Sequence, residues 1–231
     1  MQNTFTPIAN DTFIAMFTHD LKTPINSGIF AIEMLLKNSS NNLNDYQKEL
    51  LTDLLNSSKY MKRLTENALC KFKAESGKLT LNKEKCSIKT LVKHCIEETK
   101  YILKDKKQTL NFSCVQNDIT GKVDIVEFTR IINNLISNAS KYSPKNSEIN
   151  ITLKKLSNRI YFEIEDFGCG IDIKEFDKAF EKYVRLANNQ KSAGTGLGLY
   201  ITKLIVDAHG GNIKINSKLQ KGTKISFDIP A

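Results

Sequence analysis

The sequence lacks any long hydrophobic run. Its longest apolar stretches near the N-terminus, such as residues 13–17, are far shorter than the ~20 residues that a membrane-spanning helix needs. No basic segment leads into an apolar one, as it would in a secretory signal. We therefore expect this 231-residue chain to be soluble and not exported.

Paired cysteines are also lacking. The five cysteines form no C-x-x-C pair and are odd in number, so neither a zinc ribbon nor a disulfide framework is indicated, and we interpret them as reduced cytoplasmic thiols. The net charge of +9 favours an anionic partner, yet no basic cluster alternates with aromatic residues as in nucleic-acid-binding proteins. A nucleotide or an acidic protein partner accounts for the charge equally well, and nucleic acid is not expected.

What the sequence does contain is a histidine in an unusual helix. Asp20 follows His19 directly and Thr23 lies four residues after the histidine, so a nucleophile stands beside a base. His19 lies about 200° around the helix from its apolar neighbours and should face solvent. Pro24 has no N–H to donate to the carbonyl of Asp20, so the helix should bend or loosen there. The apolar stripe consists of Ile14, Phe17, Leu21, Pro24, Gly28, Ile32 and Leu35.

Two helices are predicted before residue 77, one over residues 11–37 and one that fades near residue 76, with a turn at 38–42. Each has a single apolar stripe, so the pair cannot enclose a core alone, whereas two copies would form a four-helix bundle. We therefore expect a homodimer; the alternative is that the hairpin packs on the following domain. The second stripe has nearly heptad spacing and consists of Leu43, Leu50, Leu54, Ser57, Met61, Leu64 and Ala68.

The pattern changes class after residue 77, which predicts a domain of residues 1–76 followed by a domain of residues 77–231. Strands and helices alternate here, which predicts an α+β sandwich with helices on one face of a mixed sheet. The expected strands are 78–87, 109–115, 148–156, 159–166, 212–217 and 223–229, and the expected helices are 87–104, 123–142 and 196–209.

The first chemical pattern in this domain is an asparagine pair. Asn134 and Asn138 are four residues apart and share a helix face with Lys141. Amide oxygens beside a cation suit a hydrated Mg²⁺ and the phosphates that it bridges. The alternative is an ordinary polar helix face.

The second pattern is Asp166 at the end of an apolar strand, followed by Gly168 and Gly170. Glycine allows close approach to a flat ligand, and a buried carboxylate accepts a hydrogen bond from an exocyclic amine such as that of adenine. A tight turn would produce the same pattern.

The third pattern is a glycine-rich loop, residues 194–199, that opens an apolar helix and presents backbone amides to phosphate. It lacks the Gly-Lys-Ser/Thr ending of a Walker loop, and it lies too late in the chain for a Rossmann fingerprint. A fourth pattern, Gly222-Thr223, enters the last strand and alone would indicate only a turn.

Together and in this order, these patterns resemble the histidine protein kinases of two-component signalling. Residues 19–24 match the phosphoacceptor box, 133–142 the N box, 166–170 and 194–198 the two glycine boxes, and 180–185 the phenylalanine box. The resemblance extends from about residue 13 to residue 229. Lys22 and Tyr183 depart from the usual residues without removing a functional group.

The resemblance implies a dimeric helical hairpin followed by a Bergerat-type (GHKL) ATP-binding sandwich, with ATP and Mg²⁺ as cofactors. Asn138 would be the magnesium ligand, Asp166 the adenine reader, Lys141 and Tyr142 neighbours of the phosphates, and residues 181–193 a mobile lid. The other nucleotide-binding positions implied are Asn134, Gly168, Gly170, Arg185, Gly194, Thr195, Gly196, Leu197, Gly198 and Thr223.

The implied activity is ATP-dependent phosphorylation of His19, followed by transfer to an aspartate of a response regulator. Asp20 would hold the imidazole tautomer and offset its developing charge. Thr23 would position water for dephosphorylation of the regulator; alternatively it only shapes the helix before Pro24. No sensor, membrane or receiver region is recognisable, so we expect the cytoplasmic transmitter of a longer protein, for instance of a membrane sensor.

Two other classes share part of this pattern. Clamp ATPases of mismatch repair and heat-shock chaperones, and serine kinases that inhibit sigma factors, carry the glycine boxes but lack the upstream histidine box. A degenerate kinase that acts only as a scaffold would not need His19, Asn138 and Asp166 intact.

Overall fold

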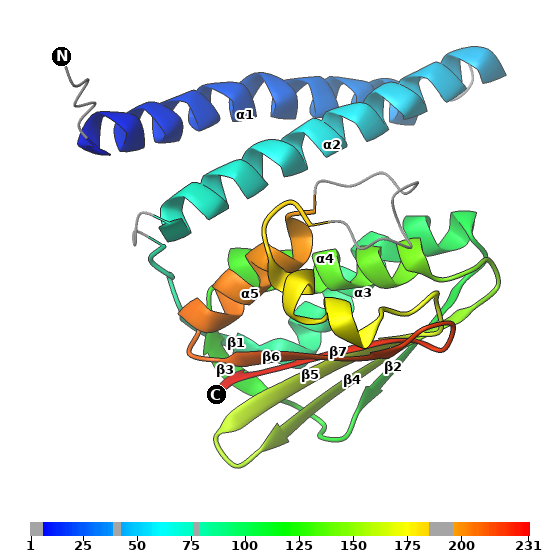
Figure 1. Ribbon diagram of the computed structural model, residues 1–231. Coiled ribbons are helices and arrows are strands. Elements are labelled where there is room, and N and C mark those ends of the chain that lie inside the picture. The colour runs from blue at the N-terminus through cyan, green and yellow to red at the C-terminus, as the bar shows by residue number, and fades with distance from the viewer. Residues whose placement is uncertain (1–6, 39–42, 76–78, 185–195) are drawn as a thin grey trace. The chain divides into compact units, whose positions relative to one another are not determined.

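The computed structural model describes residues 7–38, 43–75, 79–184 and 196–231, and the chain divides into two compact units, Met1–Leu79 and Thr80–Ala231 (Figure 1). The first unit is a pair of long helices, α1 (Pro7–Asn38) and α2 (Asp45–Glu75). Among the described residues, no helix combines the length and the hydrophobicity needed to cross a membrane.

The two helices of the first unit are antiparallel. Ion pairs join Lys22 to Glu66 at 3.6 Å and Glu33 to Lys59 at 2.8 Å, so later residues of α1 meet earlier residues of α2. The helix α1 continues through Pro24, so the proline does not end it.

A reciprocal capping box starts α2. The backbone N–H of Gln47 donates to the side chain of Asn44 at 2.8 Å, and the backbone N–H of Asn44 donates to Gln47 Oε1 at 3.0 Å. Both N–H groups lie at the start of the helix, where no helical carbonyl is available to accept from them. The cap therefore fixes the start of α2.

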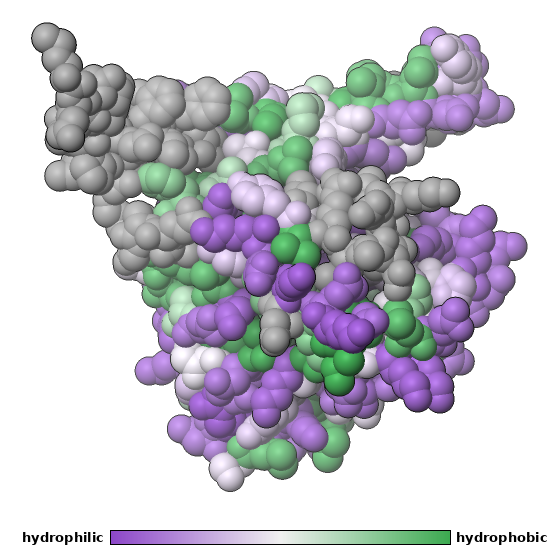
Figure 2. All heavy atoms as spheres, in the orientation of Figure 1, coloured by the Kyte–Doolittle hydropathy of each residue, from purple (hydrophilic) through white to green (hydrophobic). Residues whose placement is uncertain are grey.

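Most of the apolar stripe predicted on α2 is exposed in the single hairpin, although Leu43 and Leu64 are half-buried. Leu54 is 55% exposed, and Leu50 and Met61 are exposed as well, whereas Leu51 and Leu55 beside them are half-buried. A single chain therefore leaves apolar side chains of this unit in water, as the green spheres of the helical unit in Figure 2 show. On α1 the exposed apolar side chains include Leu21, Phe30, Met34 and Leu35.

The second unit is built on a five-stranded sheet with the strand order β2-β4-β5-β7-β6. The strand β2 runs parallel to β4 and all other neighbours are antiparallel, so the predicted mixed sheet is confirmed. Its strands are β2 (Thr109–Cys114), β4 (Glu148–Leu156), β5 (Arg159–Asp166), β6 (Asn212–Lys218) and β7 (Gly222–Pro230).

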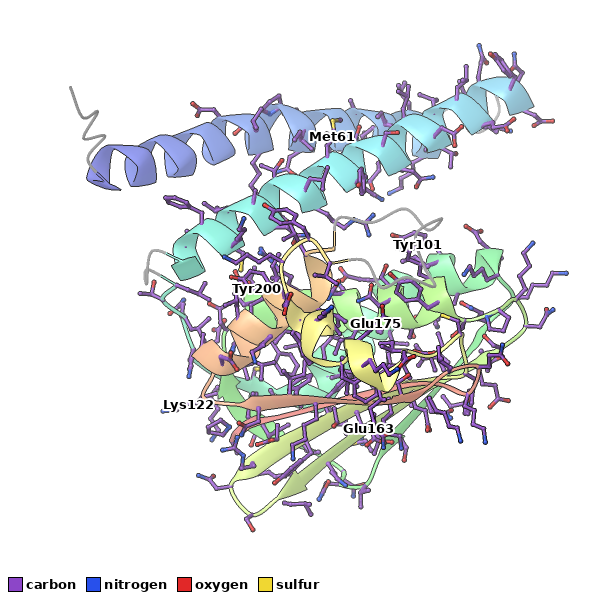
Figure 3. The ribbon with its side chains drawn as sticks, in the orientation of Figure 1. Met61, Tyr101, Lys122, Glu163, Glu175 and Tyr200 are labelled. Carbon is purple, nitrogen blue, oxygen red and sulfur yellow. The ribbon has the colours of Figure 1, made fainter. Side chains whose placement is uncertain are left out.

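Three helices cover one face of this sheet, α3 (Ile88–Asp105), α4 (Ile125–Tyr142) and α5 (Gly198–Ala208) (Figure 1). Between helices and sheet lies an aromatic core, in which Phe162 stacks on Phe227 with ring centroids 5.2 Å apart and Phe128 meets Phe227 edge-on. The opposite sheet face is polar: Glu163, labelled in Figure 3, pairs across strands with Lys224. Side chains therefore alternate along β5 and β7 between the face that packs against the helices and the face that is exposed to solvent.

Short elements depart from the sequence prediction. The expected strand 78–87 pairs only over β1 (Glu84–Ser87), which forms a separate antiparallel sheet with an unpredicted strand, β3 (Thr120–Val123). The helix predicted from residue 123 begins only after its cap, Asp124, because Val123 belongs to β3. Two unpredicted 3₁₀ turns, η1 (Ile173–Glu175) and η2 (Asp177–Phe180), follow β5.

Candidate nucleotide-binding site

The helix α4 carries the asparagine pair. Asp124 caps its start by accepting from the backbone N–H of Glu127 at 3.1 Å. Asn134 and Asn138 are half-buried. They lie beside the apolar face of the helix, which is buried in the core. This apolar face consists of Phe128, Ile131, Ile132, Leu135 and Ile136.

Two polar side chains that sequence reasoning missed hold the end of α4. Lys106 Nζ donates to the carbonyls of Ser140 at 2.7 Å and Lys141 at 2.9 Å, and Gln108 Nε2 donates to that of Ser140 at 3.1 Å. Ser140 Oγ donates in turn to Gln108 Oε1 at 2.6 Å. Burial, followed by the charges of Lys141 and Lys145, lowers the pKa of Lys106. Carbonyls that a helix end leaves unpaired are thereby satisfied, which fixes the helix end that presents Lys141.

Lys141 and Tyr142 lie together at this helix end. Lys141 Nζ donates to the hydroxyl of Tyr142 at 3.2 Å and stands 4.8 Å from its ring centroid. A charged head and an aromatic ring are thus presented side by side, an arrangement suited to phosphate and to a flat ring.

Asp166 ends β5 and is 8% exposed. Its carboxylate accepts from the backbone N–H of Gly168 at 2.9 Å and from that of Thr223. Burial raises its pKa to about 6, an effect that these backbone bonds only partly offset. A carboxylate held this way is ionised at neutral pH and aims its remaining acceptor sites at a ligand.

The loop after Asp166 requires glycine at two positions. A side chain at Gly168 would collide with the carbonyl of Tyr142, which shows that this loop lies against the end of α4. Gly170 has φ of +67°, and a side chain there would meet the backbone of Lys218. The two glycines therefore allow close contacts within the chain, and the close approach to a flat ligand stays a prediction.

Ser217 joins this loop to Thr223 and was missed by sequence reasoning. Its hydroxyl accepts from the backbone N–H of Ile171 at 2.8 Å, donates to the carbonyl of Gly222 at 2.7 Å and lies 2.9 Å from Thr223 Oγ1. One hydroxyl therefore connects three segments of the candidate site.

The helix α5 starts at Gly198, after the cap position Leu197. The first turn of a helix directs its backbone N–H groups outward, so the start of α5 is suited to an anion. The side chain of Asn134 lies against Gly198: an added Cβ there would stand 2.5 Å from Asn134 Oδ1. Asn134 Nδ2 donates to Thr202 Oγ1 at 2.8 Å, which ties α4 to the second turn of α5.

A buried histidine fixes the other ends of the same two helices. His209 Nδ1 donates to the carbonyl of Ile205 at 2.8 Å, and its Nε2 accepts from the backbone N–H of Asp124 at 3.2 Å. Burial lowers the pKa of His209, which keeps the ring neutral. Since Asp124 meets His209 while Asn134 meets Thr202, α5 runs antiparallel to α4 and its N-terminus reaches the asparagine face.

The start of the phenylalanine box also packs on α5. Lys203 Nζ lies 5.7 Å from the ring centroid of Phe180, and Lys182 Nζ lies 5.4 Å from that of Tyr200, which is labelled in Figure 3. Gly196 has φ of +69° and lies against the backbone of Tyr183. Arg185, Gly194 and Thr195 lie outside the described residues.

The structure thus brings together the asparagine face of α4, Asp166 with its glycine loop, the start of α5 and Thr223. The histidine box lies in the other unit, on α1: Asp20 and Thr23 are exposed there, and the side chain of His19 is outside the described residues.

Comparison with known proteins agrees with this architecture. Residues 123–231 match the family described as histidine kinase-, DNA gyrase B- and HSP90-like ATPases, and residues 9–77 match the His Kinase A (phospho-acceptor) domain. Each unit therefore contains a region that matches one of these two families.

Two curated relatives align with nearly the whole chain. The chain is 32% identical over 219 residues to the sensor histidine kinase YvrG of Bacillus subtilis (strain 168), covering 94% of this chain and 38% of the relative. It is 31% identical over 224 residues to the sensor histidine kinase WalK of the same organism, covering 94% and 36%. The chain belongs to the sensor histidine kinases of two-component signalling, and it spans well under half the length of these relatives.

Solved structures share the fold. Full-length ShkA in complex with AMPPNP superimposes with a TM-score of 0.73 at 21% identity, covering 95% of this chain and 45% of that one. ThkA in complex with the response regulator protein TrrA gives a TM-score of 0.61 at 18% identity, covering 95% and 62%.

Proposed function

We propose that this chain phosphorylates itself on His19 with ATP and passes the phosphoryl group to an aspartate of a response regulator. Residues 1–76 form the dimerisation and phosphoacceptor domain, and residues 77–231 form the catalytic ATP-binding domain. The observation that carries the proposal is the convergence, in the second unit, of the buried Asp166 carboxylate, the asparagine face of α4 and the start of α5.

Asp166 recognises adenine. Two backbone N–H groups orient its carboxylate, and its remaining lone pairs accept from the exocyclic amine of the base. Gly168 leaves room beside the carboxylate, where any side chain would strike Tyr142. Because the pKa of Asp166 is about 6, the acceptor is ionised at neutral pH, and nucleotide affinity weakens as the pH falls below this value.

Asn138, Asn134, Lys141 and the first N–H groups of α5 receive the phosphates. Magnesium fits this donor set, because it prefers few protein oxygens and keeps several waters, and Asn138 offers one half-buried amide oxygen. The described residues contain no cluster of three carboxylate, histidine or cysteine ligands that would hold a metal without nucleotide. Bound Mg²⁺ would neutralise the charge that develops on the phosphate oxygens.

His19 is the nucleophile. Asp20 holds the proton on one imidazole nitrogen, which leaves the other nitrogen free to attack the γ-phosphorus. The new bond is N–P, the bond to the β–γ bridging oxygen breaks, and ADP leaves with that electron pair. Placement and charge neutralisation supply most of the acceleration.

The exposed apolar side chains of the hairpin support a two-fold dimer. Leu35 on α1 is 48% exposed and Leu54 on α2 is 55% exposed in the single chain. A second hairpin covers both stripes and completes a four-helix bundle. The phosphohistidine of this bundle then meets the receiver domain of the regulator, where Thr23 orients water for the reverse, phosphatase reaction.

Incubation of the chain with γ-labelled ATP and Mg²⁺ tests the proposal. We expect one phosphoryl group per chain that is labile in acid and stable in base, located on His19 by peptide mapping. ATP labelled only in the α-phosphate is the control and should leave no label. Nucleotide hydrolysis without labelling of His19 would instead indicate a clamp ATPase.

A further inference from the structure

We propose that Thr202 is a positioning residue that holds the side-chain amide of Asn134 in a single orientation. The inference rests on the proposed function, because it assigns Asn134 to the phosphate end of the site. The hydroxyl of Thr202 accepts from Asn134 Nδ2 at 2.8 Å, across the contact between α4 and α5.

The two ends of the Asn134 amide face different surroundings. Its oxygen lies against Gly198, in the first turn of α5, where backbone N–H groups and an incoming phosphate meet. Its nitrogen points along α5 to Thr202. An asparagine amide has a donor end and an acceptor end of nearly equal shape, so only its hydrogen-bond partners distinguish the two orientations.

Thr202 is suited to this task because it is itself immobile. It is 1% exposed, it lies among the buried side chains of Ile201, Ile205 and Val206 on α5, and its branched Cβ restricts rotation. A buried hydroxyl costs free energy unless it is hydrogen-bonded, so its bond to Asn134 is favoured. The anchor is thus fixed by packing, while the asparagine that it holds is half-buried and borders the ligand.

Gly198 makes the arrangement possible. A Cβ at this position would stand 2.5 Å from the amide oxygen of Asn134 and 3.1 Å from its nitrogen. Any side chain there would push Asn134 away from Thr202. The glycine therefore serves the asparagine contact in addition to opening the loop.

Thr202→Val removes the hydroxyl and keeps the shape. We expect the rate of His19 labelling at saturating ATP to fall about tenfold, the effect of one net hydrogen bond, while the dissociation constant for Mg-ATP changes less than about threefold. Thr202→Ser should restore the rate. The matched control is Thr99→Val, since Thr99 is also a buried helical threonine, 5% exposed, whose hydroxyl donates to the carbonyl of Cys95 at 2.8 Å away from the site.

A double-mutant cycle separates positioning from general damage. If Thr202 acts through Asn134, adding Thr202→Val to Asn134→Ala should not slow labelling further. Equal slowing in both backgrounds, a serine variant as slow as valine, or equal slowing by Thr99→Val would overturn the inference. Should Thr202→Val fail to fold, Thr202→Ala takes its place in the cycle.

A spectroscopic readout keeps this inference separate from the proposed function. The side-chain amide signals of Asn134, assigned by their loss in Asn134→Ala, should shift in Thr202→Val and return in Thr202→Ser. Unlabelled His19 in the parent chain contradicts the proposed function, and these signals then decide the orientation of Asn134 alone. Unchanged signals in Thr202→Val contradict the inference whatever the kinase assay gives.

Discussion

The two units differ in how completely a single chain buries their apolar side chains. In the second unit Phe128, Phe162 and Ile160 are essentially inaccessible to water, and the helices close over one face of the sheet. In the first unit Phe30 and Leu54 remain largely exposed. The second unit therefore completes its own core, whereas the hairpin of a single chain does not.

The two units also differ in whether their polar interactions are exposed or buried. The hairpin is joined by exposed ion pairs such as Glu33 with Lys59, which are typically worth ~0–1 kcal/mol each. The second unit instead holds the end of α4 by a buried network around Gln108 and Ser140. Such a network fixes geometry closely, because each unpaired buried group would be costly. The side-chain geometry is therefore fixed most closely at the candidate nucleotide-binding site.

The largest effect should separate the two units completely. His19→Gln removes the nucleophile, so labelling from γ-labelled ATP should vanish while the affinity for Mg-ATP stays within about twofold, because the nucleotide site lies in the other unit. Asp166→Ala should do the reverse and remove most nucleotide affinity while sedimentation still gives a dimer. Retained labelling in a folded His19→Gln protein would contradict the assignment of the nucleophile.

Dimerisation should depend on the apolar side chains that a single hairpin leaves exposed. Leu54→Glu places a charge on the stripe that a second hairpin would bury, twice per dimer. Losing ~1.5–3 kcal/mol of side-chain burial at each copy should weaken the dimer at least about a hundredfold, as measured by sedimentation. Val115→Glu is the control, since Val115 is 75% exposed in the second unit. Equal weakening by both variants would argue against the four-helix bundle.

Two variants of the histidine box sharpen the division of labour within the first unit. Thr23→Ala should slow dephosphorylation of the regulator about a hundredfold and spare autophosphorylation, because one transition-state hydrogen bond is lost. Asp20→Asn should mainly slow autophosphorylation. Both half-reactions are to be measured with the cognate regulator. Equal loss of both activities in Thr23→Ala would mean that the residue only shapes the helix before Pro24.

Much of the fold was predictable because the sequence pattern is local. The strands β4 and β5 occupy the predicted residues, since buried and exposed side chains alternate along both. The strand β3 escaped prediction because it has only four residues and one of its two buried positions is Gly121, whose missing side chain makes room for Ile160. The stripe on α2 was identified correctly as apolar, yet periodicity cannot tell which partner covers it.

The site was predictable to a similar depth. Asp166, Asn134 and Asn138 stand in recognisable motifs, and the structure places them in one unit as expected. Gln108 and Ser217 belong to no motif. Gln108 lies far in sequence from Ser140 at the end of α4, and Ser217 lies far from Ile171 in the loop after β5. Only the folded structure reveals these pairs, because they depend on the packing of the whole core.

The charge on the buried Asp166 carboxylate should lower the stability of the folded protein. Burial raises its pKa from the ordinary value of 3.8 to about 6, so between these pH values the folded protein binds the proton more tightly than the unfolded chain. This contribution to stability is therefore complete below pH ~4 and is lost as the pH rises through ~6, by about 3 kcal/mol.

Removing the charge should recover part of that loss. Asp166→Asn keeps one acceptor oxygen, so without nucleotide it should be about 1–2 kcal/mol more stable than the parent at pH 7, and the difference should shrink toward pH 4. Urea unfolding at several pH values measures it, with Asp207→Asn, an exposed carboxylate on α5, as the control. The same Asp166→Asn protein should bind Mg-ATP more weakly, because its amide presents a donor where the adenine amine needs an acceptor. A variant that lost stability and affinity together at neutral pH would show that Asp166 serves the fold first, and the opposed changes expected here would show that it is kept for the nucleotide.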